Sequence, residues 1–259
     1  MRGVILKETD ILKNALNGEM ESKPMTTLRI LTKYYFGNGD SKEVIEDKLN
    51  KYMKVNYKSY SPSKWKDLIN QLVKSVEKYK TYKMIDVDEV NITENEWFNI
   101  IALNNKQLEK LAFILLVYCK INKIKNPTCD NKINNTFTDI LKEASVGSKL
   151  DNMQQRLLFN ELYKLNYISI GLSCNSTSIK INYIEENENN IKFTIDNFEN
   201  VITYYEEYKN GKKYIECECC KKRIISKTKP KKYCPKCLKI KQSEWEKKSK
   251  KVKKASDSF

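Results

Sequence analysis

Two Cys-x-x-Cys pairs near the C-terminus constrain this chain more than any other feature of its sequence. Cys217 and Cys220 form the first pair, Cys234 and Cys237 form the second, and thirteen residues separate the pairs. Two such corners can bring four thiolates onto one ion in tetrahedral geometry, with metal–sulfur distances of about 2.3 Å. The alternative is two disulfides or four idle thiols. The spacing favours a metal site, because paired CxxC motifs are far more specific than a single one.

The expected ion is zinc, one per chain, held in a zinc ribbon. Iron also binds four thiolates, but zinc is the usual structural ion where no other redox feature accompanies the site. Cys219 stands beside Cys220, so the first corner has an alternative ligand. We expect Cys220 to be the ligand, because two intervening residues let both sulfurs of the corner face one point.

The positive charge of the chain is concentrated in the same region. The whole sequence has a formal net charge of +15, and residues 209–259 contribute +14, from 19 lysines and arginines against 5 acidic residues. Such a density suits a phosphate backbone, because each cation that neutralises a phosphate releases a counterion. The alternative is a solubilising basic tail. The nucleic-acid contacts expected from this region are Lys221, Lys222, Arg223, Lys227, Lys229, Lys231, Lys232, Lys236 and Lys239.

Several classes of protein are disfavoured by what the sequence lacks. It contains no histidine, which removes the commonest general base and every histidine-ligated metal centre. Its longest apolar run, Leu111 to Cys119, is far shorter than the roughly 20 residues that a membrane span needs. No signal peptide is expected either. We therefore expect a cytoplasmic protein whose cysteines stay reduced.

Apolar periodicity predicts a mainly α (α+β) fold. A short lead-in helix is expected within residues 4–16, and three further helical patterns before residue 83 form the bundle. The almost continuously apolar segment 107–122 predicts a buried central helix. The expected parts in chain order are an N-terminal helical bundle (1–83), a winged-helix-like domain (93–197), a linker helix (198–212), the zinc ribbon (213–242) and a basic tail (243–259).

The second domain has the order of elements of a winged helix-turn-helix. Its third helix is expected after an Asp151 cap, with Leu157, Leu158, Leu162 and Leu165 facing the core. Strands are expected at 167–170, 179–184 and 191–195. In that fold the third helix enters the major groove and the hairpin forms a wing, although the fold also serves in protein docking. The nucleic-acid contacts expected from this domain are Gln155, Arg156, Asn160, Lys164 and Lys180.

Three stretches carry a resemblance to known proteins, namely LEKLAFILLVYCKI, LLFNELYKLNYISI, and CECCKK with KKYCPKC before a lysine-rich tail. On these residues the chain resembles a group of proteins from phages and prophages of low-GC Gram-positive bacteria, with a winged-helix-like domain and a C-terminal zinc ribbon. Members typically have glycine where this chain has Lys221. The resemblance implies a phage-encoded protein of the host cytoplasm that binds DNA or modulates the host, and it brings no catalytic residues.

The leading hypothesis is a non-enzymatic, zinc-stabilised protein that binds nucleic acid, with duplex DNA as the first choice. It would act as a phage-encoded transcription regulator or replication accessory. A second hypothesis is a docking protein that inhibits or modulates a host polymerase or defence complex. A third is a magnesium-dependent nuclease that uses Asp86, Asp88 and Glu89, although this acidic stretch is better explained as a solvated linker before a helix capped at Thr93.

Overall fold

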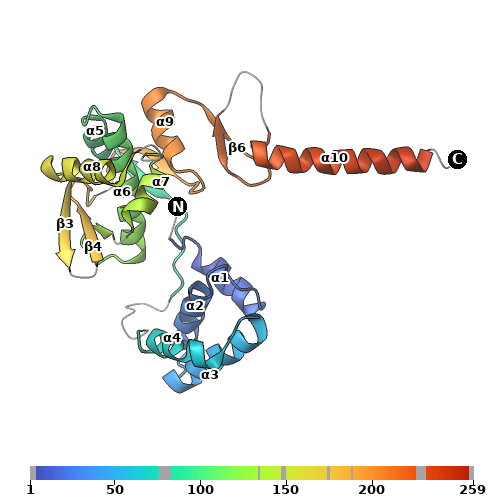
Figure 1. Cartoon of the computed structure of the whole chain (residues 1–259). Helices are drawn as coiled ribbons and strands as arrows, with labels where there is room; N and C mark the ends of the chain where they lie inside the picture. The colour runs from blue at the N-terminus through green and yellow to red at the C-terminus, as the bar shows by residue number, and fades with distance from the viewer. Residues whose placement is uncertain are drawn as a thin grey trace. The chain divides into compact units, whose positions relative to one another are not determined.

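The computed structural model describes residues 4–75, 83–133, 135–146, 150–173, 176–187, 189–225 and 232–256. The chain divides into two compact units, an N-terminal unit (Ile5–Asp88) and a C-terminal unit (Glu89–Phe259 with Met1–Val4). Helices predominate and the sheets are small and antiparallel, which confirms the mainly α (α+β) prediction (Figure 1). None of the helices in the described residues combines the length and the apolar character that a membrane crossing requires.

The N-terminal unit is a set of helices around one apolar core. Its described helices are α1 (Glu8–Leu16), α2 (Pro24–Gly37), α3 (Lys42–Asn56) and α4 (Pro62–Ser75). The start of α3 is fixed by Ser41, whose side chain accepts a hydrogen bond from the Val44 amide. Ile45, Leu49 and Met53 recur four residues apart on α3 and are fully buried. The expected helical bundle therefore has its core on this stripe.

The core of the C-terminal unit is α6 (Lys106–Lys125), in which every residue from Leu111 to Ile121 is buried. The helix contacts α5 (Glu94–Ile101), α7 (Phe137–Glu143), α8 (Asn152–Lys164) and α9 (Ile202–Asn210). Partners on several sides explain why the α6 sequence is apolar around most of its circumference. The predicted buried central helix is thus present.

The strands of the C-terminal unit form separate small sheets. One sheet has the order β2-β4-β3, with strands β2 (Lys132–Ile133), β3 (Ile168–Ser173) and β4 (Ser176–Ile181). Another pairs β1 (Val90–Thr93) with β5 (Ile191–Ile195), so the strand expected at 191–195 lies outside the sheet that contains the β3–β4 hairpin. The strand expected at 179–184 ends at Ile181. Tyr183 beyond it donates to the Ala112 carbonyl at 2.5 Å.

The core-facing side of α8 differs from the expectation. Leu158, Phe159 and Leu162 are buried, whereas Leu157 and Leu165 are 52% and 51% exposed. The ring of Phe159 stacks on Phe137 with centroids 4.2 Å apart. This contact turns the 158–159–162 face inward, and successive helical residues lie about 100° apart, so Leu157 is carried to the outside.

An ion pair is buried beneath the start of α5. Glu96 and Lys120 lie 2.9 Å apart, and their side chains are 0% and 4% exposed. The Glu96 carboxylate also accepts the Thr93 amide at 2.9 Å and the Glu185 amide at 3.0 Å. Together with the Thr93 hydroxyl, the first of these bonds forms the capping box that the sequence predicts.

Charged and aromatic contacts fix α9 in the C-terminal unit, so this segment is more than the expected linker. Glu206 pairs with Lys110 at 2.5 Å and with Lys212 at 2.7 Å. Burial raises the pKa of Glu206, but the hydrogen bonds from the two lysines outweigh it and lower the pKa to about 2. Tyr205 is buried and donates to Glu109 at 2.7 Å. α9 therefore offers a fixed surface to the chain that follows.

Candidate metal centre

The four paired cysteines lie at the ends of short, well-defined elements. β6 (Tyr214–Glu216) and β7 (Arg223–Ile225) form an antiparallel hairpin. Cys217 and Cys220 occupy the turn between these strands. Cys234 immediately precedes α10 (Pro235–Ser256), and Cys237 lies in the first turn of that helix. Proline at the first helical position suits this abrupt start, because its missing N–H would have no partner there.

The four sulfur atoms lie within 4.8 Å of one another. The Sγ atoms of Cys220 and Cys234 are 3.8 Å apart. Four bonds of about 2.3 Å to a tetrahedral ion place the sulfurs about 3.8 Å apart, so the observed separation fits such an ion. All four cysteines are free, which excludes the disulfide alternative in this structure. These residues, called the cysteine cluster below, lie close enough to hold one metal ion.

Hydrogen bonds from backbone amides favour the thiolate form of two of these cysteines. Burial raises the pKa of Cys217, but the amides of Cys234, Cys220 and Cys219 outweigh it and lower the pKa to about 6. The Cys237 amide donates to the Cys234 sulfur at 3.4 Å and lowers the pKa of that thiol. The neighbouring thiols of Cys220 and Cys234 raise the pKa of Cys237. Four thiolates at this distance repel one another, so the full ligand set needs a cation between them.

Of the two adjacent cysteines in the first corner, the cluster includes Cys220 and leaves out Cys219. Three of the four ligands, Cys217, Cys234 and Cys237, are buried, whereas Cys220 is exposed. The cluster is covered by the partly buried side chains of Ile224 and Tyr233. Cys220 is therefore the most exposed residue of the cluster.

Comparison with other proteins gives no relative. No protein-family model, curated protein or solved structure matches this chain.

Lys221 has a backbone conformation that favours glycine. Its φ is 57°, in the left-handed region. The conformation closes the first corner, because the Lys221 amide donates to the Cys217 carbonyl at 2.8 Å and the Cys217 amide donates to the Lys222 carbonyl at 2.9 Å. A side chain in this region costs roughly 1–2 kcal/mol relative to the right-handed conformation. Glycine, which has no Cβ, would adopt this conformation without that cost.

Lys221→Gly is therefore expected to stabilise the corner and to tighten metal binding about fivefold, the equivalent of about 1 kcal/mol. Competition for the metal with a chromophoric chelator measures this change. Lys221→Ala is the matched control, because it removes the same charge and keeps a Cβ in the left-handed conformation. An equal gain of metal affinity in both variants would show that the gain comes from the lost charge and not from the backbone conformation at residue 221.

Arg223, which the sequence offers as a phosphate contact, instead joins the hairpin to α9. Its guanidinium lies 3.6 Å from the centroid of the Tyr204 ring and pairs with Glu207. The side chain is only 10% exposed. Asn197 adds a second attachment by donating to the Lys221 carbonyl at 2.6 Å. Arg223 therefore acts as a structural residue, because its charge is stacked and paired.

Most of the other predicted phosphate contacts near the cysteine cluster that fall in the described residues are exposed. Lys221, Lys222, Lys236 and Lys239 are exposed, and Lys232 is exposed within 3.6 Å of Glu218. The remaining three lie outside the described residues: Lys227, Lys229 and Lys231. The backbone of α10 is helical as far as Ser256, through most of the expected basic tail.

The residues expected to enter a DNA groove share one face of α8 only in part. Arg156, Asn160 and Lys164 are exposed and four residues apart. Gln155 is half-buried and donates to the Leu150 carbonyl at 3.0 Å, so it lies off this face. Lys180 is on β4 and pairs with Asp130 at 3.0 Å. The exposed face of α8 also carries two apolar residues, Met153 and Leu157.

The acidic stretch considered as a magnesium site is used in local contacts. Asp86 accepts the Thr9 amide at 3.1 Å, and Asp88 pairs with Lys7. Glu89 is exposed. Within the described residues, the cysteine cluster is the one group of three or more potential ligands close enough to hold a metal.

Proposed function

We propose that the protein is a zinc-stabilised nucleic-acid-binding protein, with duplex DNA as the preferred ligand. The observation that carries this proposal is the cysteine cluster, whose four sulfurs gather within 4.8 Å in the most basic part of the chain. Four sulfur donors in a tetrahedral arrangement suit structural zinc. On this proposal the protein acts as a phage-encoded regulator or replication accessory in the host cytoplasm.

Metal binding would order the cations around the cluster. Among the described residues, two partly buried apolar side chains pack against the cysteines, Ile224 of β7 and Tyr233 before α10. A segment with so small a core depends on metal binding for its folding free energy. Lys222, Lys236 and Lys239 are exposed on the chain that the cluster ties together. We infer that they contact phosphates, and that their arrangement is lost when the metal is removed.

The order of elements in the C-terminal unit supports a winged-helix role for residues around α8. α6 leads to β2, α7 and α8, and the hairpin β3–β4 follows, with β2 beside β4. This is the order of a winged helix-turn-helix, whose third helix lies in the major groove. In this arrangement Arg156, Asn160 and Lys164 would face base edges and phosphates.

A salt series with the full chain tests phosphate binding by this region. We expect the double variant Lys236→Gln/Lys239→Gln to reduce the magnitude of the negative slope of log affinity against log salt by about 2, at roughly 0.9 per lost phosphate contact. The matched control is Lys123→Gln/Lys192→Gln, which removes two lysines that pair on the surface with Glu186 and Glu94. Equal slopes for the two double variants would contradict the proposal.

A second candidate function, docking to a host protein, is favoured by one observation on α8. Met153 and Leu157 are 72% and 52% exposed on the face that also carries Arg156. Exposed apolar side chains beside a cation are typical of protein interfaces. Affinity capture from nuclease-treated host lysate separates the two functions. A stoichiometric protein partner that Met153→Ser/Leu157→Ser no longer retains would favour docking, and unchanged DNA binding by the same variant would show that the two surfaces differ.

A further inference from the structure

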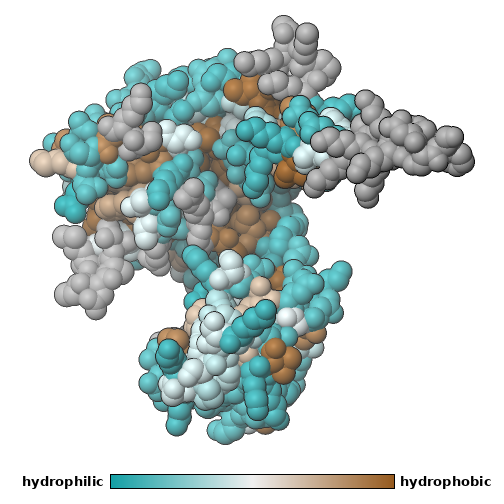
Figure 2. Space-filling model, turned by 45° about the vertical axis from the view of Figure 1, so that its right-hand side comes forward, coloured by the Kyte–Doolittle hydropathy of each residue, from teal (hydrophilic) through white to brown (hydrophobic). Residues whose placement is uncertain are grey.

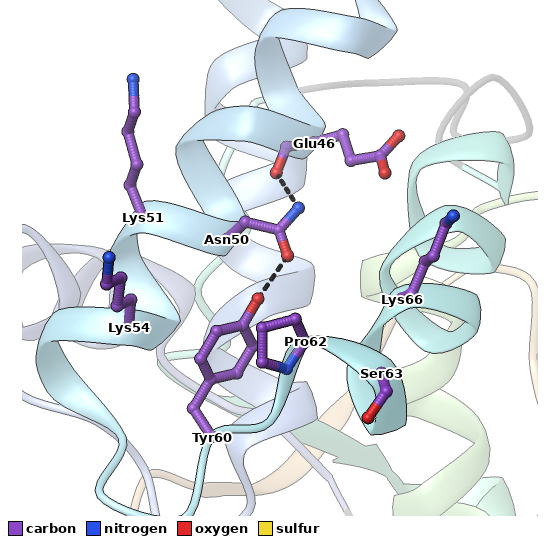
Figure 3. Close-up of a pocket in the computed structure, with 8 residues that line it drawn as sticks. All are labelled: Glu46, Asn50, Lys51, Lys54, Tyr60, Pro62, Ser63 and Lys66. Atoms are coloured by element: carbon purple, nitrogen blue, oxygen red, sulfur yellow. Dashed lines mark hydrogen bonds between the residues drawn. The ribbon is translucent and has the colours of Figure 1, made fainter.

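A cleft in the N-terminal unit is unexplained by the proposed function. It lies between α3 and α4, beside the turn that joins them, and has a volume of about 450 Å³ (Figure 3). This volume is in the range of small-molecule and nucleotide sites. Lys51, Lys54 and Asn50 line it from α3, and Pro62, Ser63 and Lys66 line it from α4.

The cleft lies in a stretch of strongly positive charge. Residues 48–66 contain six lysines and no acidic residue, with Glu46 and Asp47 directly before this stretch and Asp67 directly after it. Lys54 and Lys66 approach the cleft from its two sides, both are exposed, and neither ammonium group pairs with a carboxylate among the described residues (Figure 3). Lys51 pairs with Asp47 at 2.7 Å on an exposed surface, where such a pair contributes little. These cations favour an anionic ligand.

The acidic residue of the lining is already engaged. Glu46 contributes to the wall of the cleft. With the Asn70 amide oriented to donate, its nitrogen lies 2.8 and 2.9 Å from the two Glu46 carboxylate oxygens. This hydrogen bond directs the Glu46 charge toward α4. The lining carries three ammonium groups and this one carboxylate, so its net charge is positive.

Two rings form the apolar part of the lining. The rings of Tyr60 and Pro62 lie side by side (Figure 3). The Tyr60 hydroxyl donates to Asn50 Oδ1 at 2.6 Å, and Asn50 Nδ2 donates to the Glu46 carbonyl at 2.8 Å. These bonds fix the Tyr60 ring before any ligand arrives. The Asn50 amide is used within the unit, so the lining offers a ligand flat apolar surface and positive charge.

We propose that this cleft binds single-stranded nucleic acid, with a base against Tyr60 and Pro62 and phosphates between Lys54 and Lys66. A ring platform beside flexible cations is the combination by which proteins hold single strands without reading their sequence. An acidic peptide meets the charge requirement but brings no flat base to place against the two rings. The start of α4 at Pro62 and Ser63 adds its positive dipole end.

This site differs from the one in the proposed function in position and in metal dependence. The cysteine cluster belongs to the C-terminal unit, whereas the cleft is built wholly from residues of the N-terminal unit. On the face of the molecule in Figure 2, hydrophilic side chains cover much of the N-terminal unit. The cleft would retain its ligand when the cluster is empty.

Photocrosslinking of the full chain tests the site at residue level. The probe is a short oligothymidylate that carries one 5-iododeoxyuridine, and mass spectrometry locates the crosslink. We expect it on Tyr60. Tyr60→Ala should weaken binding at this site about tenfold, whereas Tyr60→Phe, which keeps the ring, should weaken it far less. Cys234→Ser, which empties the cluster, should leave the Tyr60 crosslink in place.

Two triple variants that remove the same number of lysines distinguish binding in the cleft from non-specific electrostatic attraction of the oligonucleotide to the N-terminal unit. Lys51→Gln/Lys54→Gln/Lys66→Gln should reduce the Tyr60 crosslink about tenfold. Lys13→Gln/Lys23→Gln/Lys74→Gln removes three exposed lysines elsewhere in the same unit and should leave it unchanged. Three results would each overturn the proposal. The first is an equal loss of the crosslink in both triple variants, and the second is a crosslink confined to residues beyond 208. The third is displacement of the probe by polyglutamate at the same concentration as unlabelled oligothymidylate.

Discussion

Replacing Cys220 with serine is expected to release the metal and to unfold the β6–β7 hairpin. Cys220 is one of the four sulfurs within 4.8 Å, and a serine hydroxyl is a poor substitute for a thiolate on zinc. Structural zinc contributes on the order of 10–16 kcal/mol to the folding of small zinc-binding segments, so this is the largest change expected for one substitution. Metal release can be followed with a chromophoric indicator, and hairpin opening by proteolysis after the lysines between Cys217 and Cys237.

Cys219→Ser is the matched control for Cys220→Ser. It changes the neighbouring, exposed cysteine that the cluster leaves out. We expect it to keep one metal per chain and a closed hairpin. Circular dichroism should show that both variants keep most of their helix content, because α6 and the helices that it contacts, α5, α7, α8 and α9, do not depend on the cysteine cluster. If Cys219→Ser loses the metal while Cys220→Ser retains it, the ligand assignment of the first corner is wrong.

Lys120→Met is expected to destabilise the C-terminal unit by about 3–5 kcal/mol, because it leaves a buried carboxylate without its counter-ion. Glu96 is 0% exposed, and Lys120 lies 2.9 Å from its carboxylate. The Thr93 and Glu185 amides still donate to Glu96 but cannot replace a full positive charge. Urea unfolding followed by the fluorescence of the buried Trp97 measures the loss.

Two further variants isolate the cause of that loss. Lys123→Met removes a lysine from the next turn of α6, but its partner Glu186 is 74% exposed, so we expect a change below about 1 kcal/mol. Glu96→Gln/Lys120→Met removes both charges and keeps an acceptor for the amides, so it should be more stable than Lys120→Met alone. A double variant as unstable as the single one would point to lost packing of the lysine stem instead of an unpaired charge.

The features that the sequence predicts well are those specified by neighbouring residues. The capping boxes at Thr93 and Asp151 depend on residues three positions apart, and both are present. The burial of α6 follows from its own composition. The cysteine corners are likewise local, and the spacing within the pair Cys217 and Cys220 was enough to prefer Cys220 over its neighbour.

The features that the sequence does not specify depend on distant partners. β5 pairs with β1, about a hundred residues earlier in the chain, and β2 is only two residues long, so neither pairing has a local signal. Leu157 and Leu158 have the same side chain, and only the packing of α8 decides which one is buried. The charge of Arg223 gave no sign that Tyr204 would stack against it. Each of these outcomes is decided by tertiary contact.

Metal analysis of the purified full chain tests the proposed tetrathiolate centre most directly. Elemental mass spectrometry of protein prepared without added metal or chelator should give one zinc per chain, and the Cys234→Ser variant should give none. A metal-free protein that keeps the β6–β7 hairpin closed and still binds DNA would contradict both the metal centre and the function proposed from it.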